Sequence, residues 1–299
     1  MSLRFLFALA TFIGVASPSP AAEIQTARGI VDIATTPARV AVFDIAALDT
    51  LDRLGIKPAG IPKKLYLEQL EHLQADADIV GDIFEPDLEA LSALDPDLII
   101  LGGRSSTKVE AAAQVAPAID MTMNGDDLVN QAKVRLSEYG RLFGREAAAT
   151  QIAAELDKQI DATRKAVAGK GTALIIMTNG PKITAYGPGS RFGWVHAALG
   201  LEPAVADVES ATHGEAVSFE FIHRANPDWL LIVDRAAAIG SGEQGARATL
   251  DNELVAGTTA WKKGQLVFLP ASDFYIAAGG IQATERVMKT LRDAFLAAR

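Results

Sequence analysis

The hydrophobic pattern along the chain contains one short apolar run that occurs twice. Residues 96–104 read Pro-Asp, then a run of apolar residues and, at a fixed offset, an arginine; residues 227–235 repeat that order. Glu89 lies seven residues before the first copy, and Glu220 lies seven residues before the second. A short apolar run bounded by turn residues predicts a strand buried on both faces. The repeat therefore indicates two similar halves, although two ordinary buried strands that match by chance are the alternative interpretation.

Other segments alternate between apolar runs and amphipathic stretches. Residues 145–167 are predicted to form one helix, because apolar residues recur every four positions and charged residues fill the gaps. The alternation of strands and helices predicts largely parallel sheets. Further strands are predicted at residues 38–43, 117–121, 172–177, 182–186 and 267–269, and further helices at residues 44–54, 86–94, 108–114, 194–199 and 279–298.

These elements predict an α/β fold of two similar lobes with largely parallel sheets, joined by a long rigid helix. A helical connector limits how far the lobes can open, since no flexible Pro/Gly/Ser-rich linker joins the halves. The expected divisions are residues 1–22 for a secretory leader, 23–144 for the first lobe, 145–168 for the connecting helix and 169–299 for the second lobe.

The composition narrows the class of protein. A chain of 299 residues is long enough for two domains, and its net charge of −9 argues against binding to nucleic acid or anionic membranes. The chain has no cysteine, which excludes disulfides, thiolate metal sites, a cysteine nucleophile and a lipid anchor on cysteine.

The first residues have the pattern of a secretory leader. Arg4 precedes an apolar run at residues 5–15, and small residues fill positions 17–22. We expect cleavage after Ala21 or Ala22 and an exported, soluble, periplasmic protein without a lipid anchor. An uncleaved anchor or a buried helix is the alternative, but the run is too short to span a bilayer.

Five polar side chains fall beyond predicted strands or in loops: Arg104, Arg191, Arg235, His213 and Tyr275. Ligands bind at the carboxyl ends of strands in open α/β sheets, and an arginine donates to an anion in a fixed fork. The set therefore predicts an anionic ligand that can include a hard metal. The competing interpretation is an exported enzyme that acts on an anionic substrate with His213 as the base, although no hydrolase, zinc-protease or nucleotide motif occurs.

The leader, the duplicated strand and the joining helix together resemble the substrate-binding proteins of bacterial ABC importers for ferric siderophores, haem and cobalamin. The resemblance covers residues 38–296 and implies their two-lobed fold (class III periplasmic binding protein type). The motifs most similar to the ferric-catecholate group, with petrobactin- and enterobactin-type ligands, are Gly-Gly-Arg at 102–104, Gly-x-x-Ser-Arg-Phe-Gly at 187–193, His213-Gly, Asp234-Arg235 and Asp273-x-Tyr275.

The resemblance implies roles for the candidate residues. Arg104, Arg191 and Arg235 would bind the catecholate oxygens, and His213 and Tyr275 would complete the coordination of iron in a tetradentate siderophore. The Fe(III)-siderophore is then the cargo, and no intrinsic cofactor is expected. A haem- or cobalamin-binding protein of the same fold is the alternative.

The resemblance also implies contacts outside the iron site. Glu89 and Glu220 would dock on the importer's membrane permease, one from each lobe. Lys63, Tyr66 and Trp194 are candidates for the rim of the cleft, where they could change ligand specificity; a solvated basic face is the alternative for Lys63. A monomer that does no covalent chemistry is expected.

Overall fold

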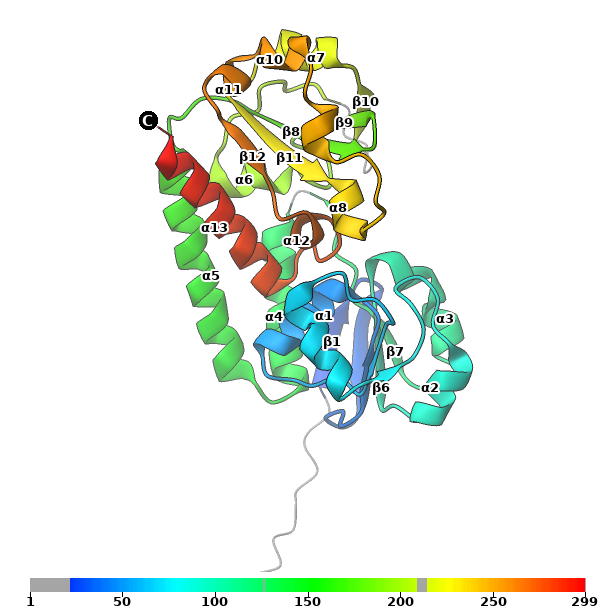
Figure 1. Cartoon of the computed structure of the whole chain (residues 1–299). Coiled ribbons are helices and arrows are strands. Elements are labelled where there is room, and N and C mark those ends of the chain that lie inside the picture. The colour runs from blue at the N-terminus through cyan, green and yellow to red at the C-terminus, as the bar shows by residue number, and fades with distance from the viewer. Residues whose placement is uncertain (1–21, 126, 209–213, 299) are drawn as a thin grey trace, which may run out of the picture.

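The computed structural model describes residues 22–125, 127–208 and 214–298, which form two lobes stacked one above the other (Figure 1). The first lobe holds a five-stranded sheet with the order β5-β4-β3-β6-β7. All its neighbouring strands run parallel, as the sequence pattern predicts. Its strands are β3 (Val40–Val42), β4 (Gly60–Ile61), β5 (Asp78–Ile79), β6 (Leu98–Leu101) and β7 (Ala118–Asp120).

The second lobe holds a mixed five-stranded sheet with the order β10-β9-β8-β11-β12. β8, β11 and β12 run parallel, whereas β9 and β10 are antiparallel to their neighbours. Only two residues, Gly180 and Pro181, separate β8 from β9, and so short a loop joins antiparallel strands alone. The strands are β8 (Ala173–Asn179), β9 (Lys182–Tyr186), β10 (Glu215–Val217), β11 (Trp229–Asp234) and β12 (Leu266–Phe268).

Helices pack around both sheets, and one of them runs along both lobes (Figure 1). This is α5 (Glu146–Val167), a single helix of 22 residues as predicted, and the closing helix α13 (Ile281–Ala297) packs beside it. The domain divisions at residues 144 and 168 remain a prediction. The other helices are α1 (Ile45–Arg53), α2 (Leu88–Leu94), α3 (Val109–Ala112), α4 (Leu128–Leu142), α6 (Trp194–Leu199), α7 (Phe219–Ala225), α8 (Arg235–Ile239), α9 (Ala246–Thr249), α10 (Glu253–Ala256), α11 (Thr259–Lys262) and α12 (Ala271–Tyr275), with 3-10 turns at Glu68–Ala75 and Gly103–Lys108.

The two copies of the repeated pattern form equivalent strands. β6 pairs with β3 and β7, β11 pairs with β8 and β12, and a seven-residue helix (α2 or α7) precedes each. The aspartate in each copy anchors the neighbouring strand: Asp97 accepts the backbone N–H of Arg39 at 2.7 Å, and Asp228 accepts that of Thr172 at 3.0 Å. The two copies are therefore similar in structure as well as in sequence.

The structure contains an N-terminal hairpin that the sequence pattern did not predict. β1 (Ala22–Thr26) and β2 (Gly29–Ile33) pair antiparallel, and Gln25 donates its backbone N–H to Glu138 of α4 at 3.1 Å. The predicted leader, residues 1–21, lies outside the described residues. Within the part that is described, no helix is long and apolar enough to cross a membrane.

One hydrophobic core extends from the first lobe into the second through α4, α5 and α13. At its second-lobe end Trp229 of β11 stacks on Phe295 of α13 with ring centroids 3.7 Å apart, and both side chains are buried. The remaining two apolar clusters each belong to one lobe. Because the lobes share the largest cluster, their relative position is set by packing as well as by the connecting helix.

Replacing Phe295 by alanine should therefore lower the free energy of unfolding by about 3–5 kcal/mol, the usual range for a large aromatic residue removed from a core. Leu296, its neighbour, is 64 % exposed and provides a matched control, Leu296→Ala, that should leave stability almost unchanged. Urea unfolding followed by circular dichroism measures both. Equal effects of the two substitutions would contradict the proposed packing of α13.

Candidate functional site

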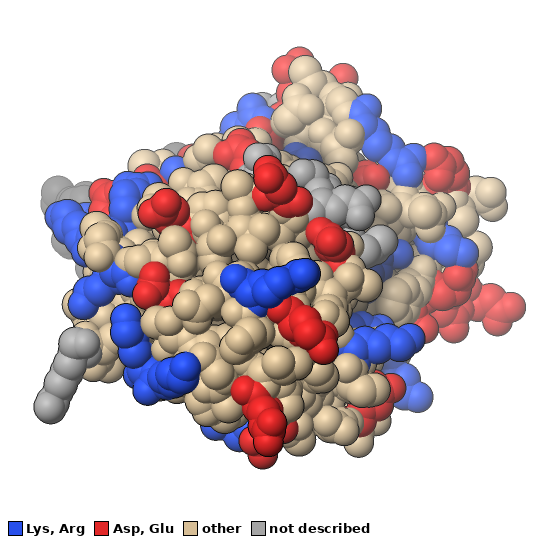
Figure 2. Space-filling model, turned by 90° about the horizontal axis from the view of Figure 1, so that it is seen from above, with Lys and Arg blue, Asp and Glu red and all other residues tan. Residues whose placement is uncertain are grey.

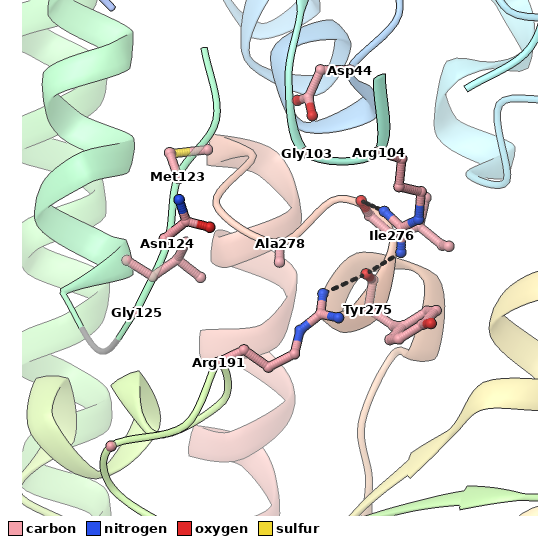
Figure 3. Close-up of a pocket in the computed structure, with 12 residues that line it drawn as sticks. Asp44, Gly103, Arg104, Met123, Asn124, Gly125, Arg191, Tyr275, Ile276 and Ala278 are labelled. Carbon is pink, nitrogen blue, oxygen red and sulfur yellow. Dashed lines mark hydrogen bonds between the residues drawn. The ribbon is translucent and has the colours of Figure 1, made fainter. Parts of the chain in front are cut away.

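A cavity of about 470 Å³ lies between the lobes, a volume in the usual range for small-molecule sites (Figure 3). Both lobes contribute to its wall, so a ligand there would contact both at once. The first lobe supplies Asp44, Gly103, Arg104, Met123, Asn124, Gly125 and Leu128, and the second supplies Gly189, Arg191, Tyr275, Ile276 and Ala278.

Arg104 reaches the cavity because β6 ends in two glycines. Gly103 has a positive φ of 51°, and a Cβ on Gly102 would lie 3.1 Å from the carboxyl group of Asp44. Glycine is favoured at both positions, because the backbone is left-handed at Gly103 and a side chain at Gly102 would crowd Asp44. The guanidinium of Arg104 then donates to the carbonyl oxygens of Tyr275 at 3.1 Å and Ile276 at 3.3 Å, both in the second lobe.

The other two arginines come from the second lobe. Arg191 lies in the turn before α6, where a Cβ on Gly193 would lie 1.8 Å from the carbonyl oxygen of Pro188, so that turn requires glycine. Arg191 donates to the carbonyl oxygen of Tyr275 at 3.3 Å. Arg235 begins α8 after β11; it donates to the Tyr275 hydroxyl at 3.3 Å and to the Asn179 side chain at 2.9 Å, and it lies outside the cavity wall.

Tyr275, the last residue of α12, is the point at which the three arginines meet. The guanidinium carbons of Arg104, Arg191 and Arg235 lie 5.1, 5.0 and 5.9 Å from the centre of its ring. Burial acts to raise the pKa of Tyr275, but the hydrogen bond from Arg235 and the three positive charges outweigh it and hold this pKa below its ordinary value. The surrounding positive charges thus favour the phenolate form of Tyr275 relative to an isolated tyrosine.

The site holds more positive charge than its surroundings neutralise. Among the described residues, the acceptors of these three guanidiniums are carbonyl, amide and phenol oxygens, and none is a carboxylate. Burial and then the charge of Arg104 lower the pKa of Arg191. The acid in the cavity wall, Asp44, caps α1 by accepting the N–H of Ala47 at 2.8 Å, and burial raises its pKa. By contrast, acidic and basic side chains are interspersed on the outer face seen from above (Figure 2).

Of the three rim candidates Trp194 is buried, whereas the rim roles of Lys63 and Tyr66 remain a prediction. Trp194 is 3 % exposed, and its ring packs on Phe274 with centroids 5.6 Å apart, so it belongs to the core. Lys63 and Tyr66 are absent from the cavity wall; the ring of Tyr66 lies under the ammonium group of Lys64, which donates to the carbonyl of Ile239 in the second lobe at 2.7 Å.

The remaining candidates lie elsewhere. His213 falls outside the described residues. Glu89 and Glu220 are exposed, each the second residue of its helix, α2 and α7, at equivalent positions in the two lobes. A hydrogen bond from Ser218 lowers the pKa of Glu220. In the described ranges no three histidine, cysteine or acidic side chains gather into a metal site.

Sequence reasoning missed one side of the cavity. Asp44 lies just beyond the end of β3, after Phe43, and Met123 and Asn124 lie beyond the end of β7, so the rule that located Arg104 also applies to them. No motif marks them, because Asp44 fits the pattern of a helix start and neutral side chains carry no distinctive signal.

Two α/β lobes joined by a helix around a ligand-sized cavity define a substrate-binding protein. The chain belongs to the periplasmic binding protein family, whose sequence profile matches residues 40–272. Its relatives include the petrobactin-binding protein YclQ of Bacillus subtilis, 34% identical over 262 residues that cover 86% of this chain and 82% of YclQ. The ferric-anguibactin-binding protein FatB of Vibrio anguillarum is 32% identical over 263 residues, with the same shares covered.

Solved structures show the same fold. The crystal structure of YclQ superposes with a TM-score of 0.86 at 30% identity and covers 93% of this chain and 99% of that one. The siderophore-binding protein BauB, bound to ferric iron and two molecules of acinetobactin, superposes with a TM-score of 0.85 at 30% identity and covers 92% and 98%. The α/β, two-lobed fold predicted from the sequence is thus confirmed.

The charges around Tyr275 lead to a prediction about its titration. In a pH titration followed by ultraviolet absorbance, one tyrosine ionisation should be missing in Tyr275→Phe. The midpoint of that ionisation in the parent should lie below the ordinary tyrosine pKa of about 10. Arg235→Gln should move that transition to higher pH, because it removes a hydrogen bond and a positive charge from the phenolate. Tyr186, whose pKa burial raises to about 12, should titrate later in every variant. A Tyr275 transition that Arg235→Gln leaves in place would contradict this account.

Proposed function

We propose that this protein captures a ferric siderophore of the catecholate type in the cavity between its lobes and delivers it to an ABC importer. The observation that carries the proposal is the convergence of three guanidiniums on Tyr275 without a described carboxylate among their acceptors. Catecholate oxygens are anionic, and an arginine can donate two hydrogen bonds to such a pair. The relatives are named for binding petrobactin and ferric anguibactin, and BauB holds ferric iron with acinetobactin. These names support the same class of ligand.

Iron in this proposal is cargo that arrives with its chelator. A siderophore that offers four oxygens leaves two positions on ferric iron open, and the phenolate of Tyr275 and the imidazole of His213 would fill them. Arg104 and Arg191 would bind the catecholate oxygens from opposite lobes, and Arg235 would stabilise the phenolate. This assignment uses every arginine that meets at Tyr275.

The cellular setting is also part of the proposal. The leader would be cleaved near Ala21 or Ala22, just before or within the start of β1, which releases a monomer without a lipid anchor into the periplasm. The protein would then bind and release its ligand without covalent chemistry. Glu89 and Glu220 would dock on basic residues of the permease, one from each lobe, because both are exposed at equivalent helix starts.

Ligand binding tests the arginine site. Ferric bis-catecholate added to the purified protein should quench tryptophan fluorescence with one-to-one stoichiometry. Arg104→Ala, Arg191→Ala and Arg235→Ala should each weaken binding by about 10- to 100-fold, since a hydrogen bond to a charged group contributes about 1.5–3 kcal/mol. The matched control is Arg247→Ala, which removes an exposed arginine that packs on Phe268 away from the cavity. Binding of haemin but of no catecholate would reject the proposed ligand.

Iron uptake tests the docking role. Cells that carry Glu89→Arg or Glu220→Arg should lose most siderophore-dependent uptake of labelled iron, while the purified variants keep the affinity of the parent for ferric bis-catecholate. Charge reversal converts attraction to a basic partner into repulsion. Glu146→Arg is the control, because Glu146 is also an exposed glutamate in the first turn of a helix, α5. Equal uptake by Glu89→Arg and Glu146→Arg would remove Glu89 from the interface.

A further inference from the structure

Arg286 of α13 binds two buried carboxylates that come from different parts of the fold. Its Nη2 lies 2.9 Å from Oδ1 of Asp49, in α1 of the first lobe. Its Nε and Nη2 lie 3.0 and 2.7 Å from the two carboxylate oxygens of Asp273, in α12. Asp49 is fully buried, and Asp273 is 7 % exposed. One guanidinium therefore joins three helices.

The junction between α13 and α1 leaves no room for rearrangement. Asp49 also accepts the backbone N–H of Ala283 at 3.0 Å, and Gln282 donates to the carbonyl oxygen of Asp49 at 3.0 Å. A Cβ on Gly280 would lie 2.7 Å from the Asp49 carboxylate, so the backbone is in close contact there. The start of α13 is fixed on the first lobe.

This junction includes Asp273, which lies two residues before Tyr275 in the cavity wall. Asp273 and Tyr275 belong to the same short helix, α12, which lies between the lobes (Figure 1). Because Arg286 holds Asp273 next to α1, it also fixes the position of Tyr275 relative to α1. Arg104 follows β6, the strand beside β3, and β3 leads into α1, so the position of Tyr275 relative to Arg104 is fixed as well. The carbonyl of Tyr275 reaches Arg104 and Arg191 from this position (Figure 3).

Stability alone is a poor reason for such a network. Two carboxylates share one guanidinium, so one negative charge stays uncompensated in a buried place, and burial raises the pKa of Asp49 to about 6. Apolar residues of similar volume often stabilise a core as well or better than buried ions. What a charged network adds is fixed geometry, because its hydrogen bonds have defined directions.

We propose that Arg286, together with Asp49 and Asp273, is a positioning residue for ligand binding, which sets the place of Tyr275 in the cavity. The inference rests on the proposed function, in which the Tyr275 phenolate contacts iron. Arg286 itself does not line the cavity.

A double-mutant cycle on the full mature protein tests the inference. The affinity for ferric bis-catecholate is measured for the parent, Arg286→Lys, Tyr275→Phe and the double variant. Lysine keeps the charge but cannot bind both carboxylates as a fork. We expect Arg286→Lys to weaken binding by about tenfold when Tyr275 is present. The effect should be clearly smaller in the Tyr275→Phe background, where only the carbonyl contacts with Arg104 and Arg191 remain to be disturbed.

Two further variants complete the design. Asp273→Asn, which keeps the shape of the side chain, should reproduce the same dependence on Tyr275 if Arg286→Lys does not fold. Arg292→Ala is the matched control on α13 and should leave affinity unchanged, because within the described ranges Arg292 forms an ion pair only with the exposed Asp293. Thermal unfolding of every variant shows whether a change in ligand affinity is accompanied by a change in the stability of the protein.

The outcomes separate the two hypotheses. If the parent binds ferric bis-catecholate and Arg286→Lys weakens binding equally in both backgrounds, the network has only a structural role and the inference is wrong. The same conclusion follows if Tyr275→Phe has no effect on affinity. If the parent binds no ferric catecholate, the proposed function fails, and the inference fails with it.

Discussion

The backbone carbonyl of Tyr275 is the acceptor on which the site depends. It receives one hydrogen bond from Arg104 in the first lobe and another from Arg191 in the second. Three guanidiniums brought this close repel one another, and the carbonyl and the face of the Tyr275 ring offset only part of that repulsion. An anionic ligand would offset the remaining repulsion. An acidic protein can bind an anion here because its positive charge is concentrated in one place.

The frame around this acceptor is stiff for identifiable reasons. α5 runs along both lobes, α13 lies along the second lobe with its start against the first, and the largest hydrophobic cluster passes through both helices. Moving the lobes far apart would expose part of that shared core, at about 25 cal/mol for each Å² of apolar surface. A ligand would therefore enter a cavity that is already formed, without wide closure of the lobes.

The sequence predicted the parts of the structure that local patterns determine. The repeated Pro-Asp runs became β6 and β11, and their arginines stand at strand ends, because burial and turn chemistry act over a few residues. The strand-end rule placed the three arginines and Tyr275 in one candidate site, but their convergence on Tyr275 depends on tertiary packing that no local pattern shows. Trp194 was misplaced because the direction of a short helix face depends on what packs against it. The β1–β2 hairpin was not predicted, although the residues of β1 alternate, because each of its strands is only five residues long and β1 begins where the leader pattern ends.

The contrast between an acidic exterior and a cationic cavity has a consequence for the rate of capture. A ferric catecholate that approaches from a distance meets the field of a chain with a net charge of −9, which repels it. The attraction of the arginines is felt only near the opening, within about 8 Å at physiological ionic strength. Salt screens the distant repulsion more than the buried attraction. Dissolved ions should then speed the first encounter, the reverse of what they do for oppositely charged partners.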